Sequence, residues 1–102
     1  MNCCYTISFA PFAYESVTVS STAVGLPSAS TYSSYRLLKA YITVEDAGVR
    51  WRIDGTAPTA IEGHLLNSGD TLSLEDPVSI ANFKAIRSTT TDAKLRVTYF
   101  RG

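Results

Sequence analysis

The chain has 102 residues, of which 45% are hydrophobic and 18% are charged, and nine basic residues balance nine acidic ones. This length allows one domain, and the composition is typical of a globular protein, so multidomain enzymes, long coiled coils and disordered tails are excluded. A formal net charge of zero argues against a dedicated nucleic-acid-binding protein, which usually carries a basic excess. We therefore expect a single domain over residues 1–102 that binds no nucleic acid.

The charges are distributed unevenly along the chain. Residues 45–76 carry seven acidic and two basic side chains, a net charge of −5, whereas residues 84–102 carry five basic and one acidic, a net charge of +4. Unlike patches steer association and fix its register, so this pattern favours contact between copies of the chain. The alternative is an ordinary solvated surface in which the charges cluster by chance.

Two adjacent cysteines, Cys3 and Cys4, lie near the N-terminus beside an alternating stretch that reaches Phe9. Neighbours in a strand point to opposite faces, so we expect no bridge between them, but one buried side chain and one exposed thiol in a reducing compartment. The sequence shows neither a signal-peptide pattern nor an apolar run that could span a bilayer. We therefore expect a protein that is made in a cytoplasm and is independent of membranes.

Alternation of apolar and polar side chains predicts a series of short strands, and no helical pattern runs longer than two turns. Alternating stretches cover residues 4–9, 16–20, 49–54, 71–75 and 94–99. The clearest runs from Val49 to Asp54, with Trp51 on the apolar side. The segment 35–44 is apolar on both sides, which is typical of a central strand or of one covered by another subunit.

Turn residues separate these strands. Asp46-Ala47-Gly48 predicts a tight hairpin, and a loop beginning at Asp54-Gly55 contains Pro58; further turns fall at 67–70, with Gly69 and Asp70, and at 88–92, where the last hairpin closes. Apolar residues between Val78 and Ile86 change parity after Ala81, which indicates a bulge, with one helical turn as the alternative. The Ser/Thr-rich segment of about residues 20–34 predicts a long surface loop or arm.

These elements indicate an all-β fold: a small antiparallel β-sandwich or jelly-roll-like barrel of seven or eight strands with an extended Ser/Thr-rich loop or arm.

Residues and motifs that could support catalysis are scarce in the sequence. His64 is the only histidine, and no serine elbow, phosphate loop or metal-ligand spacing accompanies it, so we expect it to pack at a strand start or to bond a neighbouring loop. Asp54 and Asp70 are expected to cap their turns. We therefore expect no enzyme activity, no metal and no cofactor.

Basic and aromatic side chains supply the candidate interface. Its predicted members are Trp51, Arg50, Arg52, Tyr41, Lys94 and Arg96. Arginine, tyrosine and tryptophan are enriched at protein interfaces, whereas the alternative is solubilising charge on outward positions. The basic residues leave both alternatives open, whereas six tyrosines and one tryptophan in so short a chain favour a contact surface.

Three segments of the chain form a recognisable set: Val49–Thr59 with Gly63-His64-Leu65-Leu66 and Gly69-Asp70, then Ile80–Arg87, and finally Ala93–Arg101. Together they resemble small, β-rich accessory virion proteins of tailed bacteriophages. The resemblance covers roughly residues 35–101 and implies a virion structural protein that is assembled in the host cytoplasm. It most often implies a capsid decoration or cement protein, a homo-oligomer and often a trimer, bound to the major capsid protein or other virion proteins. A neck, tail or baseplate component is the nearest alternative, and Trp51 with the tyrosines leaves a carbohydrate-binding β-sandwich module open.

Overall fold

The fold comes from a computed structural model, which describes residues 10–32 and 36–102. The predicted strand over residues 4–9 and both cysteines lie outside the described residues. The predictions from residue 10 onward, apart from those on residues 33–35, can be compared with the structure.

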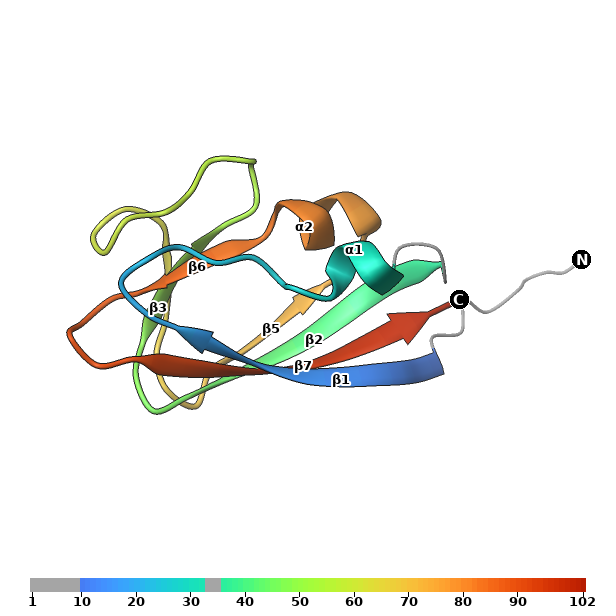
Figure 1. Cartoon of the computed structure of the whole chain (residues 1–102), viewed down its shortest axis with the longest axis horizontal. Helices are drawn as coiled ribbons and strands as arrows, with labels where there is room; N and C mark the ends of the chain where they lie inside the picture. The colour runs from blue at the N-terminus through green and yellow to red at the C-terminus, as the bar shows by residue number, and fades with distance from the viewer. Residues whose placement is uncertain (1–9, 33–35) are drawn as a thin grey trace, which may run out of the picture.

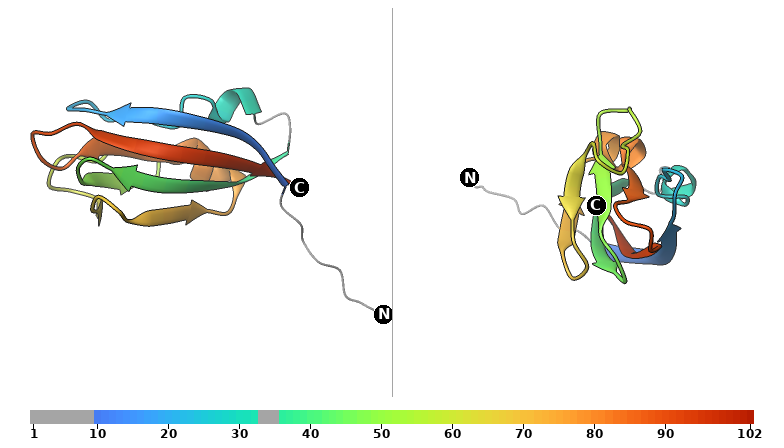
Figure 2. Two further views of the ribbon diagram at one scale, coloured as in Figure 1. Left: turned by 90° about the horizontal axis from the view of Figure 1, so that it is seen from below. Right: turned by 90° about the vertical axis from the view of Figure 1, so that its left-hand side faces the viewer.

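Seven antiparallel strands form two packed sheets (Figures 1 and 2). The larger sheet has the order β1-β7-β2-β5, built from β1 (Ala10–Val19), β7 (Ala93–Arg101), β2 (Leu37–Glu45) and β5 (Thr71–Leu74). The smaller sheet has the order β4-β3-β6, built from β4 (His64–Leu66), β3 (Val49–Arg52) and β6 (Lys84–Arg87). The predicted small all-β sandwich is confirmed.

The core lies between the sheets and follows the period-2 pattern of the sequence. The inward side chains of β7 are all buried: Ala93, Leu95, Val97 and Tyr99. β2 and β3 add further buried side chains, among them Ile42 and Val49. Because successive side chains in a strand point to opposite faces, the alternating polar residues of the same strands face outward.

The turns lie where they were predicted, but they do not close hairpins within one sheet. Asp46-Ala47-Gly48, with Asp46 at a φ of 76°, leads from β2 in the larger sheet to β3 in the smaller one. The turns at residues 67–70 and 88–92 likewise join strands of different sheets. The prediction of tight hairpins at 46–48 and 88–92 was therefore wrong, because turn residues indicate a reversal without indicating which strands pair after it.

The predicted bulge between Val78 and Ile86 was also wrong, and the alternative of a helical turn is confirmed, because a short helix, α2 (Pro77–Asn82), occupies this place. Asp76 caps it, because the Asp76 carboxylate accepts hydrogen bonds from the backbone amide and the hydroxyl of Ser79, both at 2.8 Å. Pro77 occupies the first helical turn, where a missing amide hydrogen has no effect. The helix buries Ile80. The break in the period-2 pattern of apolar residues after Ala81 is therefore caused by this turn of helix.

The described part of the predicted arm packs on the sandwich. Val24 pairs with Ala85 through two backbone hydrogen bonds of 2.8 Å, so this segment covers the free edge of β6. Leu26 is buried, and the segment ends in the short helix α1 (Ala29–Tyr32). In Figure 1 α1 and α2 lie side by side over one end of the sandwich. Of the predicted surface loop or arm, residues 20–32 therefore form a loop that packs on the sandwich and ends in a short helix.

Candidate binding surfaces

The outer face of the larger sheet spans four strands, and no helix or strand of the described residues covers it (Figure 2). Seen from below, its strands follow one another in the order β1, β7, β2 and β5 (Figure 2, left). Outward positions of neighbouring strands lie opposite one another, so their side chains form rows across the sheet. We call this surface the outer sheet face; its members are Tyr14, Ser16, Thr18, Lys39, Tyr41, Thr43, Glu45, Thr71, Ser73, Lys94, Arg96, Thr98 and Phe100.

Aromatic side chains dominate one half of the outer sheet face. Thr98 lies opposite Tyr14 on one side and opposite Tyr41 on the other, which places the two tyrosines two strand spacings apart, or about 10 Å. Their side chains are 59% and 40% exposed. In the next row the Lys39 ammonium group lies 5.3 Å from the centre of the Phe100 ring. Such rings provide large contact area with little loss of side-chain entropy on binding.

The other half of this face is polar and carries the predicted interface residues Lys94 and Arg96. The Lys94 ammonium donates a hydrogen bond to the Thr18 hydroxyl at 3.0 Å. The Arg96 guanidinium binds Glu45 at 3.2 Å and donates to the Ser16 hydroxyl at 2.7 Å. The hydrogen bond with Glu45 raises the pKa of Arg96 above its ordinary value. These cross-strand bonds hold both cations close to the sheet surface.

The remaining predicted interface residues lie on β3, in the other sheet. Trp51 points inward and packs against the core, with its ring 6.1 Å from that of Phe83 and 4.8 Å from that of His64. Arg50 and Arg52 point outward, as predicted, but the Arg50 guanidinium donates a hydrogen bond to the Gly63 carbonyl oxygen at 3.2 Å. The structure therefore divides the predicted set into two groups of three, on the two sheets of the sandwich.

The loop after β3 and the start of β4 carry the other residues considered for chemistry. β4 begins at His64, so the imidazole packs at a strand start, as predicted, and its partner there is the Trp51 ring. Asp54 binds Arg52 and accepts the Thr56 amide hydrogen bond at 3.3 Å; the bond with Arg52 lowers the pKa of Asp54. These groups line a polar hollow with Glu62 and His64. Across residues 10–32 and 36–102, no group of three metal-binding side chains comes together.

The turn predictions for the other aspartate and for Pro58 fit the structure. The Asp70 carboxylate accepts a hydrogen bond from the Asn67 amide at 2.7 Å and so closes its turn, in which Gly69 has a φ of +96°. Gly55 has a φ of +89°, a conformation that favours glycine. Pro58 is buried beneath its loop.

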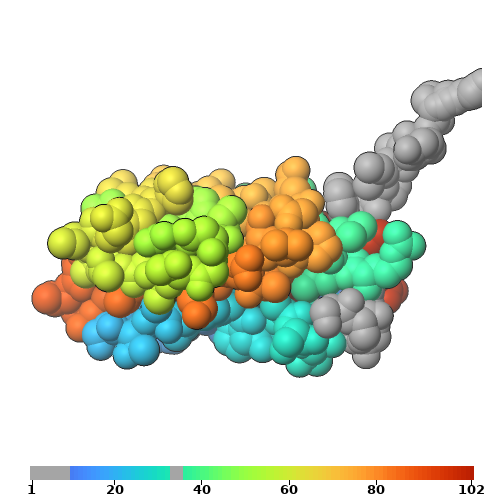
Figure 3. Space-filling view, turned by 90° about the horizontal axis from the view of Figure 1, so that it is seen from above, coloured from blue at the N-terminus to red at the C-terminus, as the bar shows by residue number. Residues whose placement is uncertain are grey.

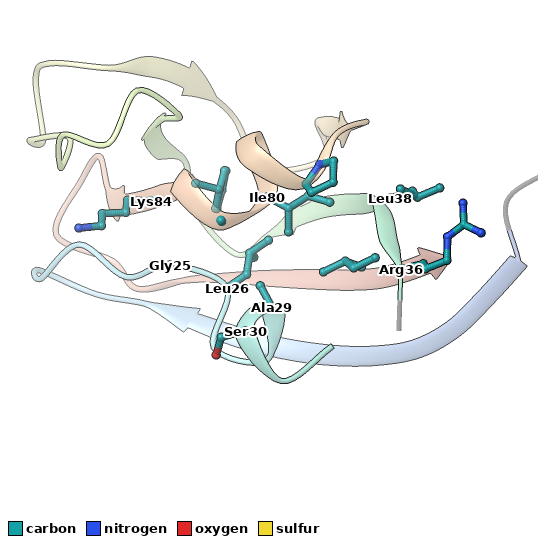
Figure 4. Close-up of a pocket in the computed structure, with 12 residues that line it drawn as sticks. Gly25, Leu26, Ala29, Ser30, Arg36, Leu38, Ile80 and Lys84 are labelled. Atoms are coloured by element: carbon teal, nitrogen blue, oxygen red, sulfur yellow. The ribbon is translucent and has the colours of Figure 1, made fainter. Parts of the chain in front are cut away.

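An apolar groove lies at the end of the sandwich where the two short helices meet (Figure 4). Its volume is about 500 Å³. Buried side chains from both sides form its walls, chiefly Leu26, Ile80 and Phe83, whereas Arg36 and Lys84 lie toward its two ends. We call this hollow the α1–α2 groove.

Sequence reasoning missed several of these surface residues. Tyr14 and Phe100 take outward positions in β1 and β7, so the period-2 pattern could have marked them as outward, but it could not have placed them on the same face as Tyr41. The α1–α2 groove had no comparable signal, because its walls come from segments that are far apart in the sequence.

Comparison with protein-family models, curated protein sequences and solved structures gave no significant match. Among the helices in the described ranges, none is long and apolar enough to cross a bilayer. The fold and the surfaces described above are therefore the basis for a functional proposal.

Proposed function

We propose that this chain is a non-enzymatic structural protein of a tailed-bacteriophage virion, and that it decorates the capsid by binding the major capsid protein. The resemblance over residues 35–101 supports the virion assignment. The outer sheet face supports the binding role, and the observation that carries it is the pair of exposed tyrosines, Tyr14 and Tyr41, on either side of Thr98.

The form of the outer sheet face favours a protein partner. Neither the α1–α2 groove nor the polar hollow lies on the outer sheet face, whereas sites for small molecules are usually concave. Tyrosine side chains are enriched among the residues that contribute most to protein–protein binding. The polar half, with Ser16, Thr18 and Thr43, offers hydroxyl groups that can form hydrogen bonds around this aromatic half.

Binding to empty capsid shells that lack this chain tests the proposal. We expect the Tyr14→Ser/Tyr41→Ser double variant to bind at least about ten times more weakly than wild type in cosedimentation. Leu65→Ser is the matched control, because Leu65 is 45% exposed but lies on β4 in the other sheet. Equal binding by wild type and the double variant would contradict a role for the outer sheet face.

Copy number in purified virions separates the alternatives. Several hundred copies per particle support decoration of the capsid lattice, few copies support a neck, tail or baseplate component, and absence from virions contradicts the proposal. The carbohydrate-binding alternative would depend on the same two tyrosines, since the Trp51 ring packs against the core and stays only partly exposed. Failure to bind shells together with binding on a glycan array would favour that alternative.

A further inference from the structure

We propose that copies of this chain associate head to tail, with the loop between β3 and β4 of one copy seated in the α1–α2 groove of the next. We call residues 53–63 the Ile61 loop. The inference rests on the proposed function, for which the resemblance implies several associated copies of the chain. Beyond the proposed function, it specifies which two surfaces of neighbouring copies come into contact and which interactions stabilise the contact.

The Ile61 loop presents an apolar side chain on an ordered turn. Ile61 is 87% exposed, the largest exposure among the large hydrophobic side chains of the described residues. The Thr59 hydroxyl accepts hydrogen bonds from the backbone amides of Ile61 and Glu62, at 3.4 and 3.0 Å. The Thr59 amide donates to the Glu62 carbonyl oxygen at 2.9 Å. Because the turn is already ordered, binding loses little conformational entropy.

The base of the same loop is held against β3. Pro58 is buried, and a Cβ at Gly63 would lie 3.1 Å from the Pro58 Cβ and 3.1 Å from the Trp51 carbonyl oxygen. The Arg50 guanidinium adds its hydrogen bond to the Gly63 carbonyl. The loop therefore projects Ile61 from a fixed base.

The α1–α2 groove matches this side chain in polarity. Leu26, Ile80 and Phe83 offer it an apolar wall, and the groove of about 500 Å³ is open to solvent in the single chain. Figure 4 shows Leu26, Ala29 and Ile80 around the hollow, with Lys84 toward one end and Arg36 toward the other. Burial of an exposed isoleucine against such walls removes apolar surface from water on both sides.

The charges of the two surfaces are also complementary. Glu62 follows Ile61 directly, and Asp54 lies at the start of the same loop. Arg36 and Lys84 form no ion pair with any residue in the ranges 10–32 and 36–102. Seating of Ile61 brings the Glu62 carboxylate to a cationic rim, so unlike charges favour this arrangement.

The Ile61 loop and the α1–α2 groove are different surfaces of one chain, so the proposed contact between copies is heterologous. Figure 3 shows the loop (yellow-green) and α2 (orange) on the same side of the molecule, toward different ends. The exposure of Ile61 shows that the loop does not enter its own groove. Each copy can therefore receive one neighbour and enter another, which closes into a ring, such as a trimer, when the rotation permits.

Light scattering on the reduced full chain over a concentration series is the first test. We expect wild type to associate. The dissociation constant of the Ile61→Ser variant should be at least about ten times that of wild type, which is a loss of about 1.4 kcal/mol in the free energy of association. Val78→Ser is the matched control, because Val78 is 67% exposed on α2 but does not line the groove. A monomeric wild type, or an Ile61→Ser variant that associates like wild type, would overturn the inference.

Mixing two defective variants tests the head-to-tail geometry. Ile61→Ser keeps the groove, whereas Ala81→Phe fills the groove with a ring but keeps the loop. We expect each variant alone to be monomeric and folded by circular dichroism, and the equimolar mixture to stop at twice the chain mass of 11.1 kDa. A mixture that stays monomeric overturns the proposed contact.

If the Ala81→Phe variant does not fold, exchange of the charges of Glu62 and Lys84 tests the same contact. Glu62→Lys and Lys84→Glu should each weaken association, and the double variant should recover it. Double-variant association no stronger than that of the single variants would overturn the role given to this pair. Shell binding of wild type and of the tyrosine double variant is measured separately. A monomeric wild type that still binds shells would overturn this inference and leave the proposed function standing, whereas a wild type that associates but does not bind shells would overturn the proposed function alone.

Discussion

The Tyr99 hydroxyl, on the inner face of the larger sheet, donates a hydrogen bond to the Glu15 carboxylate on the neighbouring strand. Glu15 also accepts hydrogen bonds from the backbone amide and the hydroxyl of Ser28, at 3.2 and 3.0 Å. One carboxylate therefore joins β1, β7 and the segment that leads into α1. This group fixes the position of α1 and, with it, one wall of the α1–α2 groove.

Replacement of Glu15 is expected to destabilise the fold. Glu15→Ala leaves the Tyr99 hydroxyl buried without its partner and releases Ser28, so we expect a loss of about 1–3 kcal/mol in the free energy of unfolding. Urea denaturation measures this loss. Glu15→Gln, which keeps an acceptor oxygen, is the control, and it should lose less than the alanine variant.

Alkaline pH is expected to weaken the fold through Tyr99. Burial raises the pKa of the Tyr99 hydroxyl well above its ordinary value, and the hydrogen bond to Glu15 adds to this shift. The unfolded chain then releases this proton near pH 10 while the folded chain keeps it, so the associated stability is present below about pH 10 and is lost as pH rises further. Urea unfolding from about pH 7 to about pH 11 measures the loss. Tyr99→Phe should lose less stability over this range, and an equal loss would contradict the assignment.

Trp51 supports the fold from the inside. Its ring packs between Phe83 and His64 but stays partly exposed, so Trp51→Ala should cost about 2–3 kcal/mol, below the range of a fully buried tryptophan. The midpoint of urea unfolding measures the cost, and Trp51→Phe should recover part of it. An unchanged midpoint in the alanine variant would show that the ring contributes nothing to stability.

Two glycines of the loop after β3 provide a matched pair. Gly55 has a φ of +89° with no neighbour within 4 Å, so Gly55→Ala adds only backbone strain, about 1 kcal/mol. Gly63 has a φ of +139° and is crowded by Pro58 and Trp51, so Gly63→Ala adds strain and overlap, about 2–4 kcal/mol. Thermal unfolding should rank the two variants in this order. Equal losses would contradict the crowding at Gly63.

The strands were predictable because most of them have one face toward the core. Val17 and Val19, or Leu95, Val97 and Tyr99, alternate with polar residues, and this period alone identifies the strand and its inner face. Pairing was not predictable in the same way. Alternation does not say which sheet a strand joins, so the two halves of the predicted interface were separated only by the structure.

The helix at residues 77–82 could have been predicted. Asp76 followed by Pro77 is a typical helix start, and Ile80 and Phe83 stand three residues apart. Burial of Leu26 and Ala29 could not have been predicted, because single apolar residues in a Ser/Thr-rich segment have no period, and their contacts come from distant parts of the chain. The groove that they help to form was hidden for the same reason.

The pairing of Ala10 with Arg101 has a mechanical consequence. Both ends of the described chain leave the sandwich at one pole, on adjacent antiparallel strands (Figure 2). A force applied between these ends would break the hydrogen-bonded pairs of β1 and β7 one after another. It would not load all of these pairs at once. The pairing of β1 with β7 would therefore resist little force applied through the two ends. Force applied across the sheet faces would leave these hydrogen bonds intact.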